Sequence, residues 1–313
     1  MRCRLSMSVC TVLVSSLALV GCHEVLAPGA SNLRPITFMQ LLANWRLYQV
    51  RLDGTGPDSL PLPGVTGDLV YPAESRDGRF LAFYQEVGNG NLVVLHADST
   101  VPRVVYQTFN PYIEQLAWSP NDSALVVALV WNAPQNGGGL QVVRVADGSV
   151  TNIASNLREP TWSPDGRTIL AAAGGQPLLG PRSNGLYRVT PPDTTAHLVF
   201  AGDSLEARFP AWSPDGSRVA FALGPYGRDL IYTMRPDGSD LRQVTSSGGS
   251  QTVTDLKPVW APDGSRLAFQ RYQEVCSAGA CSMRFDIYVV NLDGSGLRNL
   301  TSQTVWGGAA PTW

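Results

Sequence analysis

The sequence predicts an all-β protein: a six-bladed β-propeller of four-stranded blades arranged in a closed ring. Three observations support this fold class. A turn motif recurs at intervals of 44 to 50 residues, a length that suits one four-stranded blade. Short apolar segments follow each copy of the motif, and the two ends of the chain carry complementary parts of one repeat.

The recurring motif is a tight turn preceded by a tryptophan. Its clearest copies begin at Pro160, Pro210 and Pro258, where the sequence reads Pro-x-Trp-Ser/Ala-Pro-Asp-Gly, and related copies begin at Pro72 and Leu116. Proline fits the second position of a tight turn, aspartate hydrogen-bonds to its own backbone, and glycine accepts a positive φ. The tryptophan offers a large apolar surface for packing one blade on the next.

Apolar segments of strand length follow each turn. Residues 219–222 (Val-Ala-Phe-Ala) are typical of the second strand of a repeat, residues 230–234 of the third, and residues 241–245 of the fourth. A second turn, such as Asp237-Gly-Ser, separates the last two strands. Four strands in each repeat correspond to one propeller blade.

The ends of the chain predict how the ring closes. Residues 36–56 contain a second strand, a third strand and a turn, without a preceding Pro-x-Trp motif. The sequence ends at Pro311-Thr312-Trp313, which has the pattern of a first strand. We therefore expect the C-terminal strand to pair with the N-terminal blade, so that five internal blades and one shared blade leave no open sheet edge.

These repeats resemble those of TolB-type, WD-repeat-like propellers. The resemblance rests on Pro-x-Trp-Ser-Pro-Asp-Gly followed by an Ile-Ala-Phe-like strand, and it covers residues 36–313. In that family the propeller docks a peptidoglycan-associated lipoprotein, so the resemblance implies an envelope-protein partner of this kind. The family also carries an N-terminal α/β domain, for which the sequence pattern shows no counterpart.

The N-terminus has the pattern of a secretion signal. A charged start precedes an apolar run, residues 9–21, that is shorter than the roughly 20 apolar residues of a membrane-spanning helix. Residues 19–22 (Leu-Val-Gly-Cys) resemble the bacterial lipobox, which implies cleavage after residue 21 and lipid on Cys22. His23 replaces the aspartate that retains such lipoproteins at the inner membrane, which favours the outer membrane, facing the periplasm. The alternative is an ordinary signal peptide with an incidental cysteine.

The composition is that of a folded chain. Hydrophobic residues make up 44% and charged residues 15%, which supplies a core and excludes a disordered chain. The formal net charge of -2 leaves no basic surplus to displace counterions from nucleic acid, so we predict no nucleic-acid partner. We expect a signal peptide over residues 1–21, a lipidated tether over 22–35 and a monomeric propeller over 36–313.

The sequence shows no catalytic constellation. His96 and His197 fall on or near outer strands of different blades, whereas the similar propeller of oligogalacturonate lyases holds a metal with several histidines. A Gly-x-Ser-x-Gly elbow is absent, and the repeated Ser-Pro-Asp-Gly serines are turn residues. Each Asp-Gly turn carries too few acids for a calcium loop. We therefore predict a protein that is not an enzyme and that needs no metal or cofactor.

Two cysteines remain in the predicted propeller. Cys276 and Cys281 lie in a segment, residues 270–285, that we expect to be a long loop between two strands of one blade. In an oxidising compartment they predict a disulfide that constrains this loop. A redox role or a metal-binding pair is the alternative.

One end of the predicted ring is the candidate partner-binding surface. The loops that lead into each innermost strand share that end with the loops between the second and third strands. Aromatic side chains and arginines mixed with acids are typical of protein-binding surfaces. The alternative is that these are solvated loop residues. The first set of loops carries Asp68, Glu114, Arg158, Glu159, Glu206, Arg208, Asp255 and Lys257, and the second carries Trp131, Tyr226, Arg228, Tyr272 and Arg284.

Two functional hypotheses follow. The first is a lipid-anchored, non-catalytic module that docks another protein of the bacterial envelope. The alternative is a protein that binds or processes a carbohydrate or peptide, or binds a small ligand, in the central channel. An enzyme would need acids or histidines converging on the channel, whereas the candidate positions carry charges of both signs.

Overall fold

The computed structural model describes residues 34–41, 44–62, 64–99, 101–108, 111–131, 138–173, 184–225, 227–249, 252–277, 280–302 and 308–313. The predicted signal peptide, Cys22 and Tyr226 lie outside the described residues, as do the side chains of Trp131, Cys276 and Cys281. The propeller is one compact unit, residues 33–313. In the described segments, no helix has the length and apolar character needed to span a membrane.

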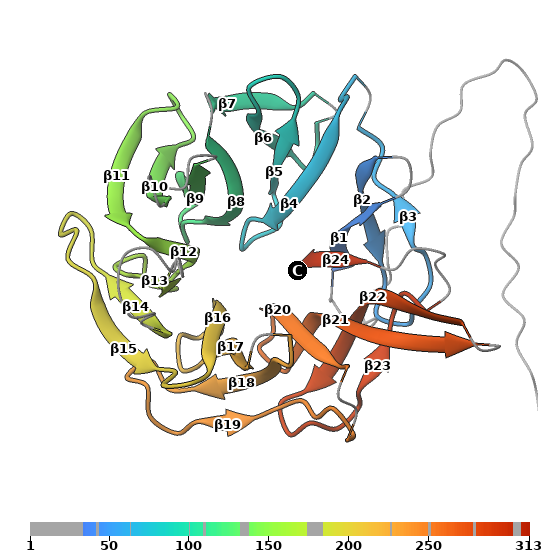
Figure 1. The fold of residues 1–313 in the computed structure, drawn as a ribbon. Helices are drawn as coiled ribbons and strands as arrows, with labels where there is room; N and C mark the ends of the chain where they lie inside the picture. Colours follow the sequence, from blue (N-terminus) through green and yellow to red (C-terminus); the bar gives the residue numbers. More distant parts are fainter. Residues whose placement is uncertain are drawn as a thin grey trace, which may run out of the picture. The chain divides into compact units, whose positions relative to one another are not determined.

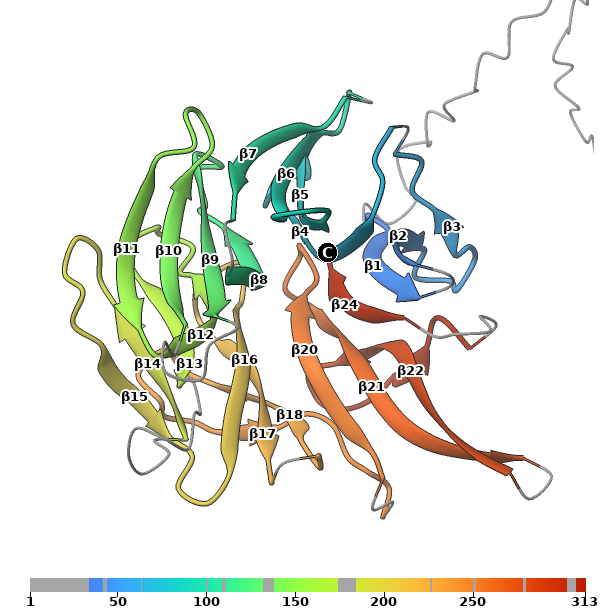
Figure 2. The ribbon, with the colours of Figure 1, turned by 45° about the horizontal axis from the view of Figure 1, so that its top comes forward.

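Six four-stranded antiparallel sheets surround a central axis, which confirms the predicted propeller (Figures 1 and 2). In every blade the strand that carries the Pro-x-Trp motif, or the related segment of blades 2 and 3, is innermost (Figure 1). We number the blades 1 to 6 along the chain. From the axis outward, blade 1 consists of β24 (Ala309–Thr312), β1 (Ile36–Leu41), β2 (Trp45–Val50) and β3 (Asp58–Ser59), and blade 2 of β4 (Asp68–Glu74), β5 (Phe80–Glu86), β6 (Asn91–His96) and β7 (Arg103–Gln107). Blade 3 consists of β8 (Pro111–Trp118), β9 (Ala124–Trp131), β10 (Gly139–Arg144) and β11 (Val150–Ser155), and blade 4 of β12 (Leu157–Trp162), β13 (Ile169–Ala173), β14 (Gly185–Val189) and β15 (His197–Ala201). Blade 5 consists of β16 (Glu206–Trp212), β17 (Val219–Gly224), β18 (Leu230–Met234) and β19 (Arg242–Gln243), and blade 6 of β20 (Thr254–Trp260), β21 (Arg266–Ser277), β22 (Ala280–Asn291) and β23 (Arg298–Asn299).

The C-terminal strand closes the ring, which confirms the expectation from the two ends of the sequence. β24 pairs with β1 in antiparallel register, with Thr312 opposite Thr37 and Ala309 opposite Met39. The indole Nε1 of Trp313 donates to the backbone carbonyl of Arg34 at 3.0 Å. β1 therefore has a hydrogen-bonded neighbour on its inner side, as a closed ring requires.

The repeated turns form as their residue types predict. In blade 5 the hydroxyl of Ser213 donates to the carboxylate of Asp215 at 2.6 Å, and this carboxylate accepts the backbone N–H of Ser217 at 3.0 Å. These hydrogen bonds favour the charged carboxylate and lower the pKa of Asp215 to about 2. Gly216 follows with a φ of 73°, a left-handed conformation that glycine adopts at little cost.

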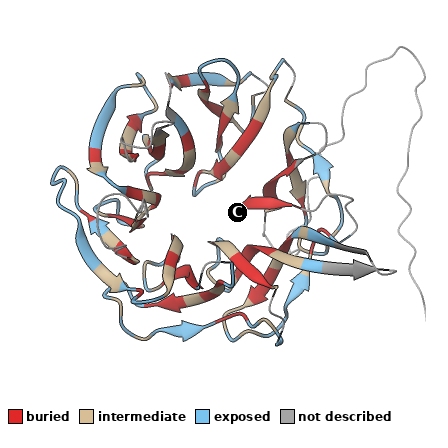
Figure 3. Cartoon of the chain, in the orientation of Figure 1, coloured by how far each residue is buried: buried red, intermediate tan, exposed pale blue. Residues whose placement is uncertain are grey.

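The hydrophobic core lies mainly between neighbouring blades. Phe83, Phe221 and Phe269 occupy equivalent places on the second strands of their blades and are fully buried. Figure 3 shows buried positions gathered on the inner strands and exposed ones on the outer strands. Trp118 and Trp260 also donate their indole N–H to a backbone carbonyl of the preceding blade, at 2.9 and 3.0 Å. In these two blades the motif tryptophan therefore joins neighbouring blades by a hydrogen bond as well as by apolar contact.

The innermost strands contain β-bulges that redirect one side chain in each blade. The residue before the motif proline has a positive φ of 48° to 55° in five blades, at Tyr71, Glu159, Phe209, Lys257 and Ala310. The strand register shifts at the same places. Proline has no N–H to donate to the sheet, so the pairing is interrupted there. A bulge at this point turns the preceding side chain away from the direction that regular alternation would give it.

The expectation of a loop over residues 270–285 is wrong. β21 and β22 pair without interruption from Arg266 opposite Asn291 to Ser277 opposite Ala280. Polar and apolar residues alternate from Ser282 to Ile287, the pattern of a strand with one face in solvent. Cys276 and Cys281 are register partners near its tip, which suits a cross-strand disulfide.

Candidate functional site

The two ends of the ring differ in chemistry. We call the end where the innermost strands begin the start face, and the end where the motif turns follow these strands the turn face. The structure places the described candidate residues at the beginning of the innermost strands, on the loop before β18, or on the β21–β22 hairpin. Most of their charged groups are paired within the chain.

Arg208 illustrates this pairing. It forms an ion pair with Asp229 at 2.8 Å and a longer one with Glu206 at 3.7 Å. Asp229 is fully buried, and burial raises the pKa of its carboxyl while Arg208 opposes this rise. Arg208 therefore compensates a buried charge, and its removal would affect stability before it affected a partner.

A second buried pair joins Asp255 to Arg271. Nε and Nη2 of Arg271 donate to the two carboxylate oxygens at 2.6 and 2.7 Å, a bidentate arrangement. Both residues are buried, and burial raises the pKa of Asp255 against the effect of the guanidinium. The arginine also lies over the rings of Tyr288 and Phe269, at 5.0 and 5.5 Å. This pair holds β20 against β21 inside blade 6.

Four other charged candidates also have partners in the chain. Asp68 accepts the backbone N–H of Trp45 at 2.9 Å. Glu114 and Arg158 face each other across neighbouring blades at 3.6 Å. Arg284 pairs with the buried Asp286 at 2.7 Å.

Apolar and basic side chains remain exposed on the start face. Tyr112, at the beginning of β8, is 36% exposed, and Phe285, on the β21–β22 hairpin, is 41% exposed. The ring of Phe285 lies 4.5 Å from that of Tyr272, a predicted candidate. Arg228 is exposed on the loop before β18. A partner could therefore reach the predicted candidates Arg228 and Tyr272, together with Tyr112 and Phe285, which the sequence does not predict.

Glu159 and Lys257 belong to the channel interior. The carboxylate of Glu159 is buried and accepts the backbone N–H of Phe209 at 2.7 Å; burial raises its pKa to about 7. Nζ of Lys257 lies 4.9 Å from the ring centre of Tyr71 and 5.4 Å from that of Phe209. Burial lowers the pKa of Lys257, although Glu159 and Glu114 oppose this shift. The bulges described above direct these groups toward the axis.

A cavity of about 350 Å³ opens on the turn face. Its wall is built from the motif itself: five tryptophans and nine prolines line it. The bulge residues Tyr71, Phe209, Lys257 and Ala310 also contribute to it, as does Gln115 at the equivalent sequence position of blade 3. The sequence pattern predicts the motif as a turn and a blade contact, and it does not predict this cavity. The signal for the cavity was the placement of every Pro-x-Trp on an innermost strand.

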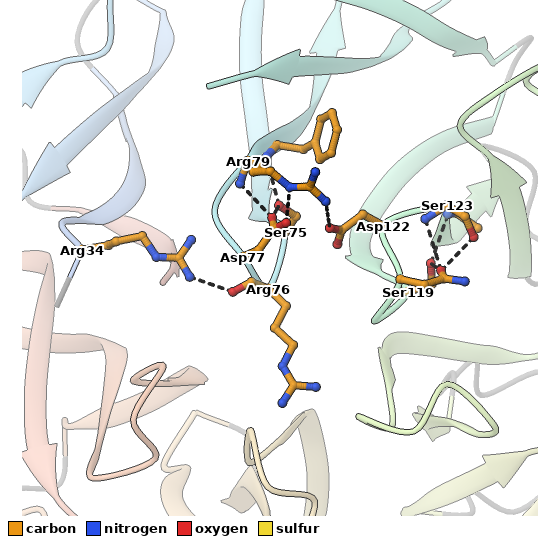
Figure 4. Close-up of polar contacts among 11 residues, drawn as sticks. Arg34, Ser75, Arg76, Asp77, Arg79, Ser119, Asp122 and Ser123 are labelled. Atoms are coloured by element: carbon orange, nitrogen blue, oxygen red, sulfur yellow. Dashed lines mark hydrogen bonds and ion pairs between the residues drawn. The ribbon is translucent and has the colours of Figure 1, made fainter. Parts of the chain in front are cut away.

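Arg76 spans the mouth of this cavity. It belongs to the motif turn of blade 2, and its Nη2 donates to the carbonyl of Pro214 in the turn of blade 5 at 2.8 Å. Blades 2 and 5 stand opposite each other in the ring (Figure 1). Arg34 in turn donates to the backbone carbonyl of Arg76 at 2.7 Å, and Figure 4 shows the Arg76 side chain extending away from its own turn.

The described residues contain no group of three or more His, Cys, Asp or Glu side chains arranged to hold a metal ion. His96 lies in a T-shaped contact with Phe80, at 5.0 Å between ring centres, and its Nδ1 accepts the backbone N–H of Asp98 at 3.1 Å. His197 begins β15 and is exposed on the outer side of blade 4.

Comparison with known proteins identifies relatives of the propeller. No family model matches the chain. The chain is 33% identical over 113 residues to the Tol-Pal system protein TolB of Anaeromyxobacter dehalogenans, a match that covers 35% of this chain and 22% of that protein. The match thus spans about a fifth of the curated relative's length.

Solved structures resemble the chain over most of its length. The crystal structure of TolB from Acinetobacter baumannii superposes with a TM-score of 0.68 at 14% identity, covering 89% of this chain and 66% of that one. A putative TolB from Agrobacterium tumefaciens gives 0.62 at 18% identity, with coverages of 88% and 90%. An oligogalacturonate lyase in complex with manganese is also similar, with a TM-score of 0.55 at 18% identity, covering 85% of this chain and 74% of that one. At these identities the likeness concerns the fold.

Together, the six blades, the closing C-terminal strand and these similarities show that the chain carries a TolB-like six-bladed β-propeller.

Proposed function

We propose that the protein is a non-catalytic binding module of the bacterial cell envelope that docks another envelope protein through its propeller. The observation that carries this proposal is the TolB-like propeller together with its sequence relative, which is named as a protein of the Tol-Pal system. A peptidoglycan-associated lipoprotein is the partner class that the resemblance implies. The module acts as a monomer.

The start face is the docking surface in this proposal. Exposed Tyr112, Phe285 and Arg228 lie there, with Tyr272 packed beside Phe285. Aromatic residues and arginines are over-represented among the side chains that contribute most to protein–protein binding. The intramolecular ion pairs around them fix the shape of the surface rather than supply free charges.

Lipid on Cys22 anchors the module to the outer membrane, on its periplasmic side. The lipobox-like residues 19–22 support this part of the proposal. Several acyl chains on one cysteine would hold the protein firmly at a bilayer. Replacing Cys22 by serine should move the protein from the membrane fraction to the soluble fraction, and an unchanged distribution would contradict the anchor.

A channel enzyme is the alternative, since the oligogalacturonate lyase shares the fold. The described channel residues bring Glu114, Glu159 and Lys257 near one another, beside the rings of Tyr71 and Phe209. Glu159 is committed to the backbone N–H of Phe209, and Glu114 faces Arg158. These interactions within the chain favour a structural role for the carboxylates of Glu159 and Glu114.

The docking proposal is tested by capture of partners from cross-linked envelopes with tagged, full-length protein. Tyr272→Ala and Arg228→Ala should reduce recovery of an envelope partner several-fold without changing the melting temperature. Arg235→Ala is the matched control, because Arg235 is exposed on the β18–β19 turn. Arg208 is unsuitable for this test, since its loss would leave the buried carboxylate of Asp229 without its charged partner. Equal recovery from all variants would exclude the start face.

A further inference from the structure

The cavity on the turn face has no part in docking at the start face. Its volume of about 350 Å³ falls within the roughly 300–1,000 Å³ of small-molecule sites. Prolines and tryptophans are 14 of the 30 residues that line it, so much of the wall is rigid and apolar. The indole N–H groups of Trp118, Trp260 and Trp313 donate to backbone carbonyls, whereas those of Trp162 and Trp212 are buried without a hydrogen-bond partner among the described residues.

A single cationic amine lies on the cavity lining. Lys257 is the only lysine of the chain. Among the described residues, its Nζ contacts the rings of Tyr71 and Phe209 and makes no hydrogen bond or ion pair. Lys257 is half-buried, and a partly desolvated ammonium without an acceptor is costly; the cost falls when an anion or a hydrogen-bond acceptor approaches it.

A second cation stands at the mouth. Arg76 crosses the opening and donates to the carbonyl of Pro214, a neutral acceptor. Hydrogen bonds between a guanidinium and a carboxylate are stronger than those to a neutral carbonyl. An anionic ligand at the mouth can therefore replace Pro214 as the acceptor.

The acidic side chains around the cavity have partners of their own, so Lys257 and Arg76 can still favour an anionic ligand. Glu74 also lines it, but its carboxylate accepts the hydroxyl of Thr37 and lies 4.0 Å from Arg34. Glu159 and Glu114 act on Lys257 from outside the lining; Glu159 accepts the backbone N–H of Phe209, and Glu114 faces Arg158 at 3.6 Å. Gln115 contributes a buried side-chain oxygen without a hydrogen-bond partner among the described residues.

We propose that this cavity binds a small organic carboxylate with an apolar or aromatic body. The carboxylate would lie between the ammonium of Lys257 and the guanidinium of Arg76, and the body would lie against the proline and tryptophan wall. A neutral sugar fits less well, because the proline wall has no N–H groups to pair with its hydroxyls.

The first test uses intrinsic fluorescence, since five tryptophans line the cavity. The purified full chain is titrated with phenylacetate and, separately, with its neutral isostere phenylacetamide. We expect saturable quenching by phenylacetate, with phenylacetamide at least ten-fold weaker. No saturable signal, or equal affinity for both probes, would overturn the proposal.

The second test uses variants of the two cations. Lys257→Met keeps the side-chain length and removes the charge, so phenylacetate affinity should fall ten-fold or more, whereas Lys257→Arg should stay within about three-fold of the wild type. Arg76→Gln should weaken binding and also speed association, because it removes the contact across the mouth. Arg103→Gln, on the outer strand β7, is the matched control.

Melting temperatures confirm that each variant is folded. If Lys257→Met does not fold, the phenylacetate affinities of Lys257→Arg and Arg76→Gln, compared with that of the wild type, still test the proposal. Undiminished phenylacetate affinity in Arg76→Gln together with equal affinity for the two probes would place binding elsewhere. Loss of affinity in Arg103→Gln as well would show a non-specific electrostatic effect and would equally overturn the proposal. Neither result bears on capture of an envelope protein by the start face.

Discussion

The buried ion pair in blade 6 gives the sharpest test of the energetics. Replacing Arg271 by methionine keeps the length of the side chain and its contacts with the neighbouring rings, but it removes the guanidinium from Asp255. Asp255 is fully buried, so the variant retains a carboxylate without its charged partner. Breaking a buried pair in this way costs about 3–5 kcal/mol of unfolding free energy.

The control is an exposed pair of the same residue types. Arg144 and Asp147 lie 3.5 Å apart with side chains that are 64% and 53% exposed. Arg144→Met should change the unfolding free energy by about 0–1 kcal/mol, because water already solvates both charges. Urea unfolding followed by tryptophan fluorescence measures both variants. In thermal scans, the Arg271 variant should melt on the order of 10 °C lower than the wild type.

The pH dependence separates this explanation from loss of packing. Burial already raises the pKa of Asp255 in the wild type, and without Arg271 it should rise further. A carboxyl with a raised folded-state pKa destabilises the folded chain above that pKa, and the penalty shrinks as pH falls and the group becomes neutral. Arg271→Met should therefore be closer to the wild type at pH 5 than at pH 8, and Asp255→Asn/Arg271→Met should recover part of the loss at pH 8. A loss below about 1 kcal/mol, or one independent of pH, would refute the reasoning.

Three further predictions follow from the described contacts. Burial raises the pKa of Glu159 from 4.5 to about 7, so the wild type should lose on the order of 3 kcal/mol of unfolding free energy as pH rises through this range. Glu159→Gln keeps an acceptor for the backbone N–H of Phe209, so its unfolding free energy should depend less on pH in urea titrations between pH 4.5 and 8. Cys276 and Cys281 should form a disulfide in protein secreted to an oxidising compartment, so thiol labelling before reduction should leave both unmodified, and labelling of either would contradict the pairing. Deleting residues 309–313 removes β24 and exposes the inner edge of β1, so light scattering should show association that grows with concentration, whereas a stable monomer would contradict closure by this strand.

The repeat made the fold predictable. Each Ser-x-Asp-Gly turn is a local structure whose geometry follows from its own residues, as the bonds of Asp215 show. The complementary ends of the sequence also predicted closure, because an unpaired first strand and a blade lacking one can satisfy each other. Local chemistry repeated at a constant interval is enough to specify both.

The candidate surface was less predictable, because its charges are neutralised by residues far along the chain. The sequence predicts Arg208 as a surface candidate, but its guanidinium pairs with Asp229, 21 residues later in the chain. The contact between Arg76 and Pro214 joins residues 138 positions apart and depends on which blades stand opposite each other. Such pairings require the ring geometry and the strand register, which no local pattern contains.

The bulges explain why Glu159 and Lys257 lie in the channel although the sequence predicts them on the start face. Regular alternation would point each residue of an innermost strand to one side of its blade, but the following proline interrupts the ladder and turns the preceding residue to a positive φ. The motif proline itself is the sequence signal for the bulge, and the residue before it is the one that turns toward the axis.

The same feature decides where this propeller can hold a specific ligand. The motif gives the blades nearly identical frames, and prolines and tryptophans repeat around the cavity. The residue before the proline, or its equivalent in blade 3, differs in every blade: Ala310, Tyr71, Gln115, Glu159, Phe209 and Lys257. Because the repeated wall is almost symmetric, the orientation of a bound molecule must come from these positions. Lys257 is the one cation among them, so the carboxylate of a ligand should be directed toward blade 6.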